Sequence, residues 1–126
     1  MKSIMHEKGT HCYLCTLLHD DFSVKNDLQE HHVIYGNGRR ALSEKYGLKV
    51  YLCFKHHTYA GGPEAIHRDA EIALIVKKAA QLAFMYRFPE LNFREIFGKS
   101  YLEENEIAGR RRDEQSNIDG TFNKRS

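Results

Sequence analysis

Two short pairs of metal-binding side chains, far apart in the chain, constrain its fold more than any other feature. The first pair is Cys12-x-x-Cys15 and the second is Cys53-x-x-His56, with 37 residues between them. A two-residue spacing lets one turn of backbone place two ligands on adjacent corners of a zinc tetrahedron. We therefore predict a structural Zn²⁺ held by these four residues, so the intervening segment must fold back on itself.

Two alternatives to this ligand set stay open in the sequence. The three cysteines could simply pack in the core, as free cysteines often do. Paired spacing and an odd cysteine count favour thiolate ligands over both packing and a disulfide framework. His11 and His57 each adjoin a proposed ligand, so either could replace His56. We prefer His56 because its pair repeats the spacing of the first pair and leaves His57 for other work.

Length and composition are those of one globular domain. The chain has 126 residues, of which 41% are hydrophobic and 29% charged, with a net charge of +2. No apolar run approaches the ~20 residues that span a bilayer, and the first residues lack the apolar segment of a signal peptide. We therefore expect a cytoplasmic protein with no membrane partner. We expect one domain over residues 1–107 and a disordered charged tail over 108–126, which is poor in apolar residues.

Local patterns predict a hairpin with a basic connection. β-Branched and aromatic residues favour strands over residues 31–35 and 49–52, separated by a turn at 36–38 and a helical turn near 43–46. The chain between residues 37 and 55 carries five basic residues and one acidic residue, an excess of +4. Such an excess suits a phosphate backbone, although a solvated loop surface would have the same composition. The candidate phosphate contacts are Arg39, Arg40, Lys45 and Lys49.

Helices are predicted in the second half of the chain. A helix over 69–87 is indicated by apolar residues at three- and four-residue spacing. Pro63 suits the first turn of a short helical segment before it, and a last helix over 93–97 has Asn92 as its cap and Gly98 at its end. The expected buried face of the long helix consists of Ile72, Ile75, Ala79, Leu82, Ala83 and Tyr86.

A second group of histidines lies between and after the zinc-binding pairs. His31 and His32 fall in the first strand, where neighbours point to opposite faces unless the end of the strand turns both towards one site. One histidine can bind a metal ion while its neighbour transfers a proton. With His57 and His67 the doublet forms a candidate site. We expect three nearby aromatic residues, Tyr35, Tyr51 and Phe54, to pack in the core and not to stack on bases.

These motifs resemble the HNH endonucleases of the ββα-metal (His-Me finger) superfamily, in the version whose hairpin is held by a zinc knuckle. The resemblance rests on the two ligand pairs and on Glu30-His31-His32-Val33-Ile34, and covers roughly residues 12–102. Segments 43–47, 66–67 and 93–102 are similar to small HNH-like proteins of phages and prophages of Gram-positive bacteria. The chain also has a distant similarity to phage recombination-enhancement nucleases that depend on RecA.

The resemblance implies a small α+β fold, namely a zinc-stapled ββα-metal (HNH) hairpin-helix core with C-terminal helices. The implied function is a metal-dependent DNA endonuclease or nickase that hydrolyses phosphodiester bonds in the bacterial host cell, in phage DNA metabolism or recombination. DNA is then the expected partner, together with a host or phage recombination protein such as RecA. The main alternative is a non-catalytic zinc-containing module that binds nucleic acid or a host protein; a zinc-ribbon transcription regulator is a weaker one.

Carried over residue by residue, the resemblance makes His32 the general base, and His31 and His57 ligands of one divalent catalytic metal (Mg²⁺, Mn²⁺, Zn²⁺, Co²⁺ or Ni²⁺). The third ligand of the family follows four residues after His57, where this chain has Gly61. We predict that His67 takes its place. The middle asparagine of the family pattern also has no clear counterpart here.

Overall fold

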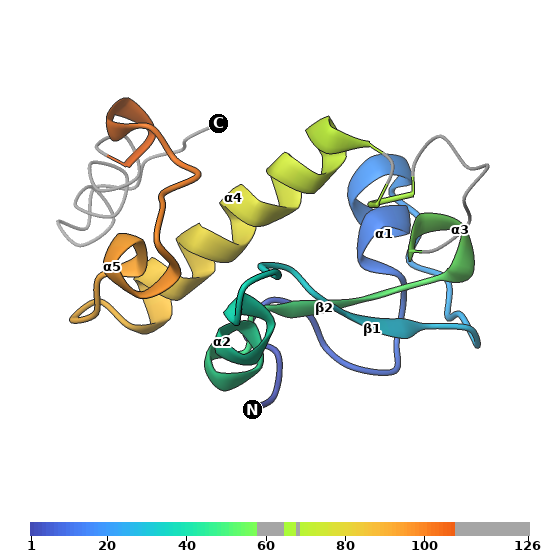
Figure 1. Ribbon diagram of the computed structural model, residues 1–126. Coiled ribbons are helices and arrows are strands. Elements are labelled where there is room, and N and C mark those ends of the chain that lie inside the picture. The colour runs from blue at the N-terminus through green and yellow to red at the C-terminus, as the bar shows by residue number, and fades with distance from the viewer. Residues whose placement is uncertain (58–64, 68, 108–126) are drawn as a thin grey trace, which may run out of the picture.

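The computed structural model describes residues 1–57, 65–67 and 69–107, which form a small α+β fold with a two-stranded antiparallel sheet (Figure 1). The strands pair with His31 opposite Val50 and His32 opposite Lys49. Helices α1 and α3 lie at one end of this hairpin and α2 at the other, while α4 runs alongside and leads to α5 (Figure 1). In chain order the elements are α1 (Tyr13–His19), β1 (Gln29–His32), α2 (Arg39–Tyr46), β2 (Lys49–Leu52), α3 (Phe54–His57), α4 (Ala70–Arg87) and α5 (Phe93–Phe97).

Strand β2 has the predicted bounds, but the prediction for β1 was shifted. The strand begins at Gln29 and ends at His32, although residues 33–35 are also strand formers. At Ile34 the backbone bonds to a side chain of α2 in place of a neighbouring strand. Ser43 Oγ donates to the carbonyl of Ile34 at 2.6 Å and accepts from the Ile34 N–H at 3.1 Å. The doublet His31-His32 therefore stands at the end of the strand.

The basic connection between the strands is a helix and not a loop. Helix α2 spans eight residues, from Arg39 to Tyr46, where only a helical turn near 43–46 was predicted. Gly47 ends it in the left-handed conformation at φ 74°, and a Cβ atom there would lie 2.5 Å from the Lys2 carbonyl oxygen. The N-terminal arm also donates from the Ile4 N–H to the Gly47 carbonyl at 2.9 Å. Glycine is therefore needed at this position for both conformation and space.

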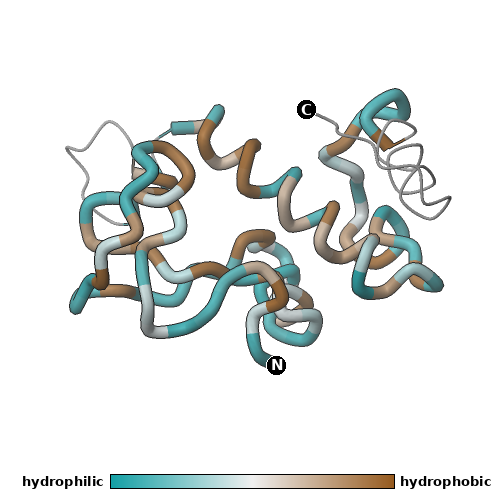
Figure 2. The backbone as a smooth tube through the Cα atoms, turned by 180° about the vertical axis from the view of Figure 1, so that it is seen from behind, coloured by the Kyte–Doolittle hydropathy of each residue, from teal (hydrophilic) through white to brown (hydrophobic). Residues whose placement is uncertain are grey.

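Helix α4 has nearly the predicted bounds, but a different face of it is buried. Asp69 caps the helix, its carboxylate accepting from the N–H groups of Glu71 and Ile72. The predicted core residues Ile75 and Tyr86 are 48% and 71% exposed. Apolar residues recur along the whole helix (Figure 2), so their spacing alone does not select a face. The buried residues are Ile72, Val76, Ala80, Gln81 and Phe84.

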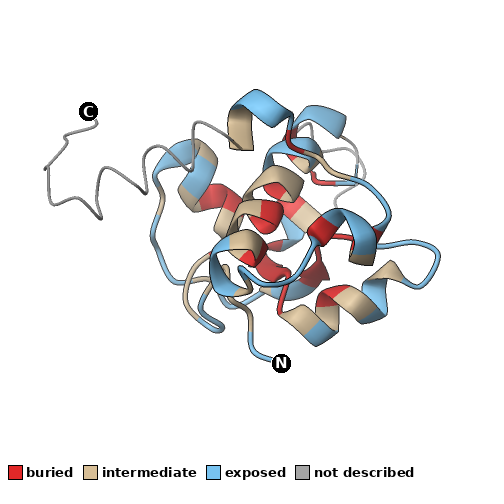
Figure 3. Ribbon diagram, turned by 90° about the vertical axis from the view of Figure 1, so that its left-hand side faces the viewer, coloured by how far each residue is buried: buried red, intermediate tan, exposed pale blue. Residues whose placement is uncertain are grey.

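An aromatic cluster around Phe84 determines which face of α4 turns inward. The Phe84 ring lies 5.3 Å from Tyr46, 5.4 Å from Phe93 and 5.9 Å from Phe97, measured between centroids. Each pair is close to perpendicular, an arrangement that aromatic rings favour. Helix α5 follows the prediction, with Asn92 as its cap and Gly98 at its end. Figure 3 shows buried residues gathering where the helices and the hairpin face one another.

Two of the three aromatic residues predicted to pack around the hairpin do not do so. Tyr51 is buried, but Tyr35 and Phe54 are 43% and 53% exposed. Tyr35 follows the point where the chain leaves β1, and Phe54 opens α3, so neither lies within the paired strands. The predicted segment beginning at Pro63 and the predicted tail over 108–126 lie outside the described residues. Within the described part of the chain, no helix has the length and apolar content needed to cross a membrane.

Candidate functional site

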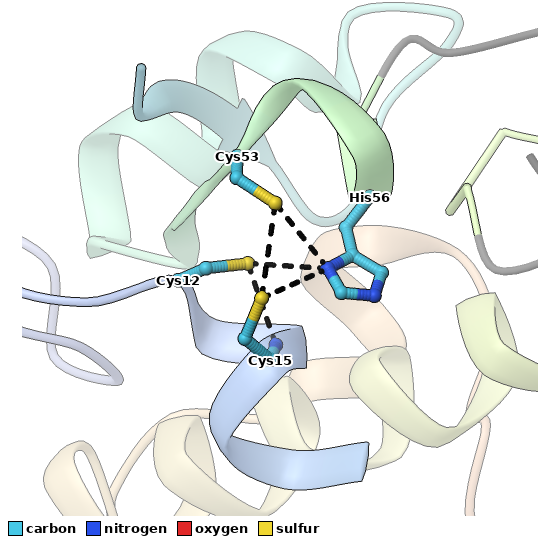
Figure 4. A group of neighbouring side chains, drawn as sticks. All are labelled: Cys12, Cys15, Cys53 and His56. Carbon is cyan, nitrogen blue, oxygen red and sulfur yellow. Dashed lines mark hydrogen bonds between the residues drawn. The ribbon is translucent and has the colours of Figure 1, made fainter. Parts of the chain in front are cut away.

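The two predicted ligand pairs meet at the ends of two short helices. Cys12 caps α1, its sulfur accepting from the Cys15 N–H at 3.4 Å. Cys53 precedes α3, and its carbonyl accepts from the His56 N–H at 3.1 Å. Each backbone turn thus points both members of its pair the same way, and the four side chains face a common centre (Figure 4).

The spacing of the four ligand atoms fits a tetrahedral metal ion. His56 Nδ1 lies 3.4 Å from Cys12 Sγ, 3.4 Å from Cys15 Sγ and 3.5 Å from Cys53 Sγ, and the sulfurs of Cys15 and Cys53 are 3.8 Å apart. With Zn–S near 2.3 Å and Zn–N near 2.05 Å, the edges of a zinc tetrahedron are about 3.8 Å for S···S and about 3.6 Å for S···N. These side chains therefore lie close enough to bind a metal such as zinc.

The environment of the cluster also suits a metal ion. All four residues are buried, and the three cysteines are free thiols. Burial raises the pKa of Cys15 to about 12, so a cation is needed to keep its thiolate form at neutral pH. The structure also decides between the candidate histidines, because His56 joins the cysteines while His11 and His57 do not.

A second group joins three other predicted histidines. His31 on β1, His57 at the end of α3 and His67 before α4 place their ligand nitrogens within 4.8 Å of one another. Their ring centroids are 5.2 to 5.3 Å apart. Gln29 Oε1 lies 2.8 Å from His57 Nδ1, and an amide oxygen only accepts. This contact holds the proton on Nδ1 and leaves the lone pair of His57 on Nε2.

Two of these imidazoles are held in the neutral form at neutral pH. Burial lowers the pKa of His31 to about 3, with further contributions from His57 and His67. Burial and His67 also lower the pKa of His57. A neutral ring keeps one lone pair, which is the form that binds metal ions. Three clustered imidazoles form a ligand set that suits first-row transition metals.

His32, the predicted general base, borders the same pocket, but its ring is bonded to a carboxylate. A cavity of about 310 Å³ is lined by His31, His57 and His67 and also by His32 and Arg40. His32 Nε2 lies 2.8 Å from Glu44 Oε1. Since a carboxylate accepts, the Nε2–H donates and Nδ1 is left with its lone pair. The end of β1 therefore presents both histidines of the doublet to one pocket.

Glu44 is itself held by positive groups. Its carboxylate lies 3.0 and 3.1 Å from Lys49 Nζ and 3.2 Å from the N-terminal amine. Hydrogen bonds from His32, Lys49 and the N-terminus lower the pKa of Glu44 to about 2. The carboxylate beside His32 is therefore ionised across the physiological range, and it can stabilise an imidazolium.

The four predicted phosphate contacts divide into two groups. Lys49 is buried and pairs with Glu30 and Glu44. Burial alone would lower the pKa of Lys49, but its hydrogen bonds to the two carboxylates outweigh burial and raise that pKa. Arg39 Nε donates to the Phe97 carbonyl at 2.9 Å, so Arg39 ties α2 to α5. Lys49 and Arg39 therefore make contacts within the fold, and their part in binding a phosphate stays a prediction. Arg40 and Lys45 are exposed, and of these only Arg40 lines the histidine pocket.

Comparisons with family models, curated proteins and solved structures find no match for this chain. The site is therefore interpreted from its own geometry, which includes two residues that sequence reasoning missed. Gln29 had a detectable signal, since residues two apart in a strand share a face and His31 is its neighbour. Glu44 had none, because its contact with His32 depends on how α2 packs against the hairpin.

Proposed function

We propose that this chain is an HNH-type, metal-dependent DNA endonuclease or nickase. The observation that carries this proposal is the pocket shared by three clustered histidines and by His32, whose tautomer is set by a carboxylate. The hairpin followed directly by α3, with ligands from both, is compatible with the ββα-metal arrangement that the HNH resemblance implies. Phage or prophage DNA metabolism, with a recombination protein such as RecA, is the setting proposed from the same resemblance.

The Cys12, Cys15, Cys53 and His56 cluster is proposed to bind a structural zinc ion. It joins α1 to the turn that carries α3, and His57 follows His56 directly in that helix. A closed site with four protein ligands has no open position for a substrate, which is the usual feature of structural zinc. Its role would be to fix α3 and thereby position His57.

The chemistry assigned to the pocket is phosphodiester hydrolysis. A divalent cation held by His31, His57 and His67 would supply charge relief at the phosphate and at the leaving 3′ oxygen. His32 Nδ1 accepts the proton of the attacking water, which typically contributes ~10²- to 10⁴-fold. Glu44 keeps the opposite ring nitrogen protonated and stabilises the imidazolium that results. Arg40 holds the phosphate backbone at the rim of the pocket.

Supplying the purified protein with each candidate metal tests this function. We expect cleavage of plasmid or single-stranded DNA with at least one of Mg²⁺, Mn²⁺, Zn²⁺, Co²⁺ and Ni²⁺, and no cleavage without added metal. The substrates should include nicked, branched and RecA-coated DNA. If none of these substrates is cut with any metal while DNA is still bound, the non-catalytic binding module replaces the nuclease.

The exposure of Arg40 at the histidine pocket gives a prediction for binding. On duplex DNA the log–log salt slope is about −0.9 for each phosphate neutralised. We expect Arg40→Ala to reduce the slope by about one phosphate, because Arg40 is exposed at the pocket. Arg94→Ala is the matched control, since Arg94 is an exposed arginine on α5 away from the histidines. Equal slopes for the two variants would remove Arg40 from the DNA-binding surface.

A further inference from the structure

A second cavity adjoins the histidine pocket and has a different lining. It measures about 450 Å³ and is bordered by Lys77, Lys99 and Tyr101 together with Tyr35 and His67. Tyr35 and His67 also border the histidine pocket, so the two cavities are contiguous. The volume lies within the ~300–1,000 Å³ range of ligand sites.

Two ammonium groups in this cavity have no carboxylate partner in the part of the chain that the structure describes. Lys77 Nζ lies 5.3 Å from the centroid of Tyr35 and 5.5 Å from that of Tyr101, and Lys99 Nζ lies 5.1 Å from Tyr101. These are cation–π distances, and they hold both lysines against the aromatic rings. Among the described residues no carboxylate forms an ion pair with either lysine. Burial and the charge of Lys99 lower the pKa of Lys77.

We infer that this cavity binds the nucleotide next to the scissile phosphate, with Lys77 and Lys99 on its phosphate group. The inference rests on the proposed function, since it places the subsite beside the three histidines. It also names a substrate class, which is a strand with an unpaired nucleotide at the cleavage site. A duplex presents its phosphates on a convex surface, whereas this subsite is concave.

The exposed ring of Tyr35 supports an unpaired nucleotide over a duplex. Tyr35 is 43% exposed and stands where the two cavities meet. A base freed from its stack can lie on such a ring, and stacking of this kind contributes ~1–3 kcal/mol per base in single-strand binding proteins. Lysines for the phosphate and an aromatic ring for the base are the recurring elements of such sites.

Binding of a fluorescent oligothymidylate of about 10 nucleotides tests the subsite without added divalent metal, so that cleavage plays no part. We expect Lys77→Gln and Lys99→Gln each to weaken binding about tenfold, and loss of both lysines to reduce the single-strand salt slope by about 0.7, for the one phosphate that they share. Lys78→Gln is the matched control, since it removes the same charge from the next residue of α4, where Lys78 pairs with Glu106. Tyr35→Leu should weaken binding of the oligothymidylate more than binding of a duplex of equal length.

Far-ultraviolet circular dichroism and thermal melting of each variant show whether it is folded. Lys77→Arg, which keeps the charge, should bind like the wild type. The inference is overturned if folded Lys77→Gln and Lys99→Gln variants bind the oligothymidylate as tightly as Lys78→Gln. It is also overturned if the wild type and all variants bind the duplex more tightly than the oligothymidylate, and by the same factor. If the two lysine variants lose oligothymidylate binding but the wild type cuts no DNA, the proposed nuclease is wrong and the nucleotide subsite is kept.

Discussion

Replacing Cys53 with serine should remove one tightly bound zinc ion per chain and sharply lower the melting temperature. The sulfur of Cys53 is one corner of a buried cluster that joins α1 to α3. Structural zinc supplies about 10–16 kcal/mol of apparent binding free energy in finger peptides, as much as the ~5–15 kcal/mol by which a domain is stable. Without the ion, three ligands stay buried with no cation to hold them together.

Zinc per chain and thermal unfolding, measured on the wild type and the Cys53→Ser variant, check this prediction. His57→Ala is the control, because His57 lies one residue beyond His56 but does not join the cysteine cluster. Substitution with Co²⁺ separates the two metal sites, since thiolate ligands give intense charge-transfer absorption and imidazoles do not. A Cys53→Ser protein with unchanged zinc content and melting temperature would show that the cysteines only pack.

The candidate zinc site was predictable because its information is local. A two-residue spacing determines how two side chains of one backbone turn point, whatever the rest of the chain does. The sequence therefore showed the four ligands, Cys12 with Cys15 and Cys53 with His56. It also showed that the fold must bring the two pairs together. The cap Asn92 was equally visible, because a cap acts on its own first turn.

The errors all concern features that depend on tertiary packing. The buried face of α4 follows from the position of Phe84 in an aromatic cluster, which the apolar spacing of that helix does not reveal. Lys49 has one negative partner in its own segment, Glu44, and a second, Glu30, which lies 19 residues earlier on the neighbouring strand. Charge counted along a segment does not show which charges neutralise one another across a hairpin.

The second prediction with a large effect separates the roles of His32 and His57. His32→Ala removes the proposed proton acceptor but none of the three imidazoles proposed to bind the metal, so metal content and DNA binding should persist. Cleavage should then fall by the ~10²- to 10⁴-fold expected for loss of a general base. His57→Ala should weaken binding of the exchangeable metal by at least the ~10- to 100-fold typical of losing a residue that merely supports a ligand. Its cleavage should fall with metal occupancy.

Metal titration and cleavage rates on both variants check these roles, and Glu44→Gln adds a graded control. The introduced amide can still accept from His32 Nε2–H but no longer supplies the negative charge, so the cleavage rate of this variant should lie between those of the wild type and the His32→Ala variant. If His32→Ala instead loses the exchangeable metal, then His32 is a ligand and the base lies elsewhere. If all three variants cleave like the wild type, the pocket is not where DNA is cut.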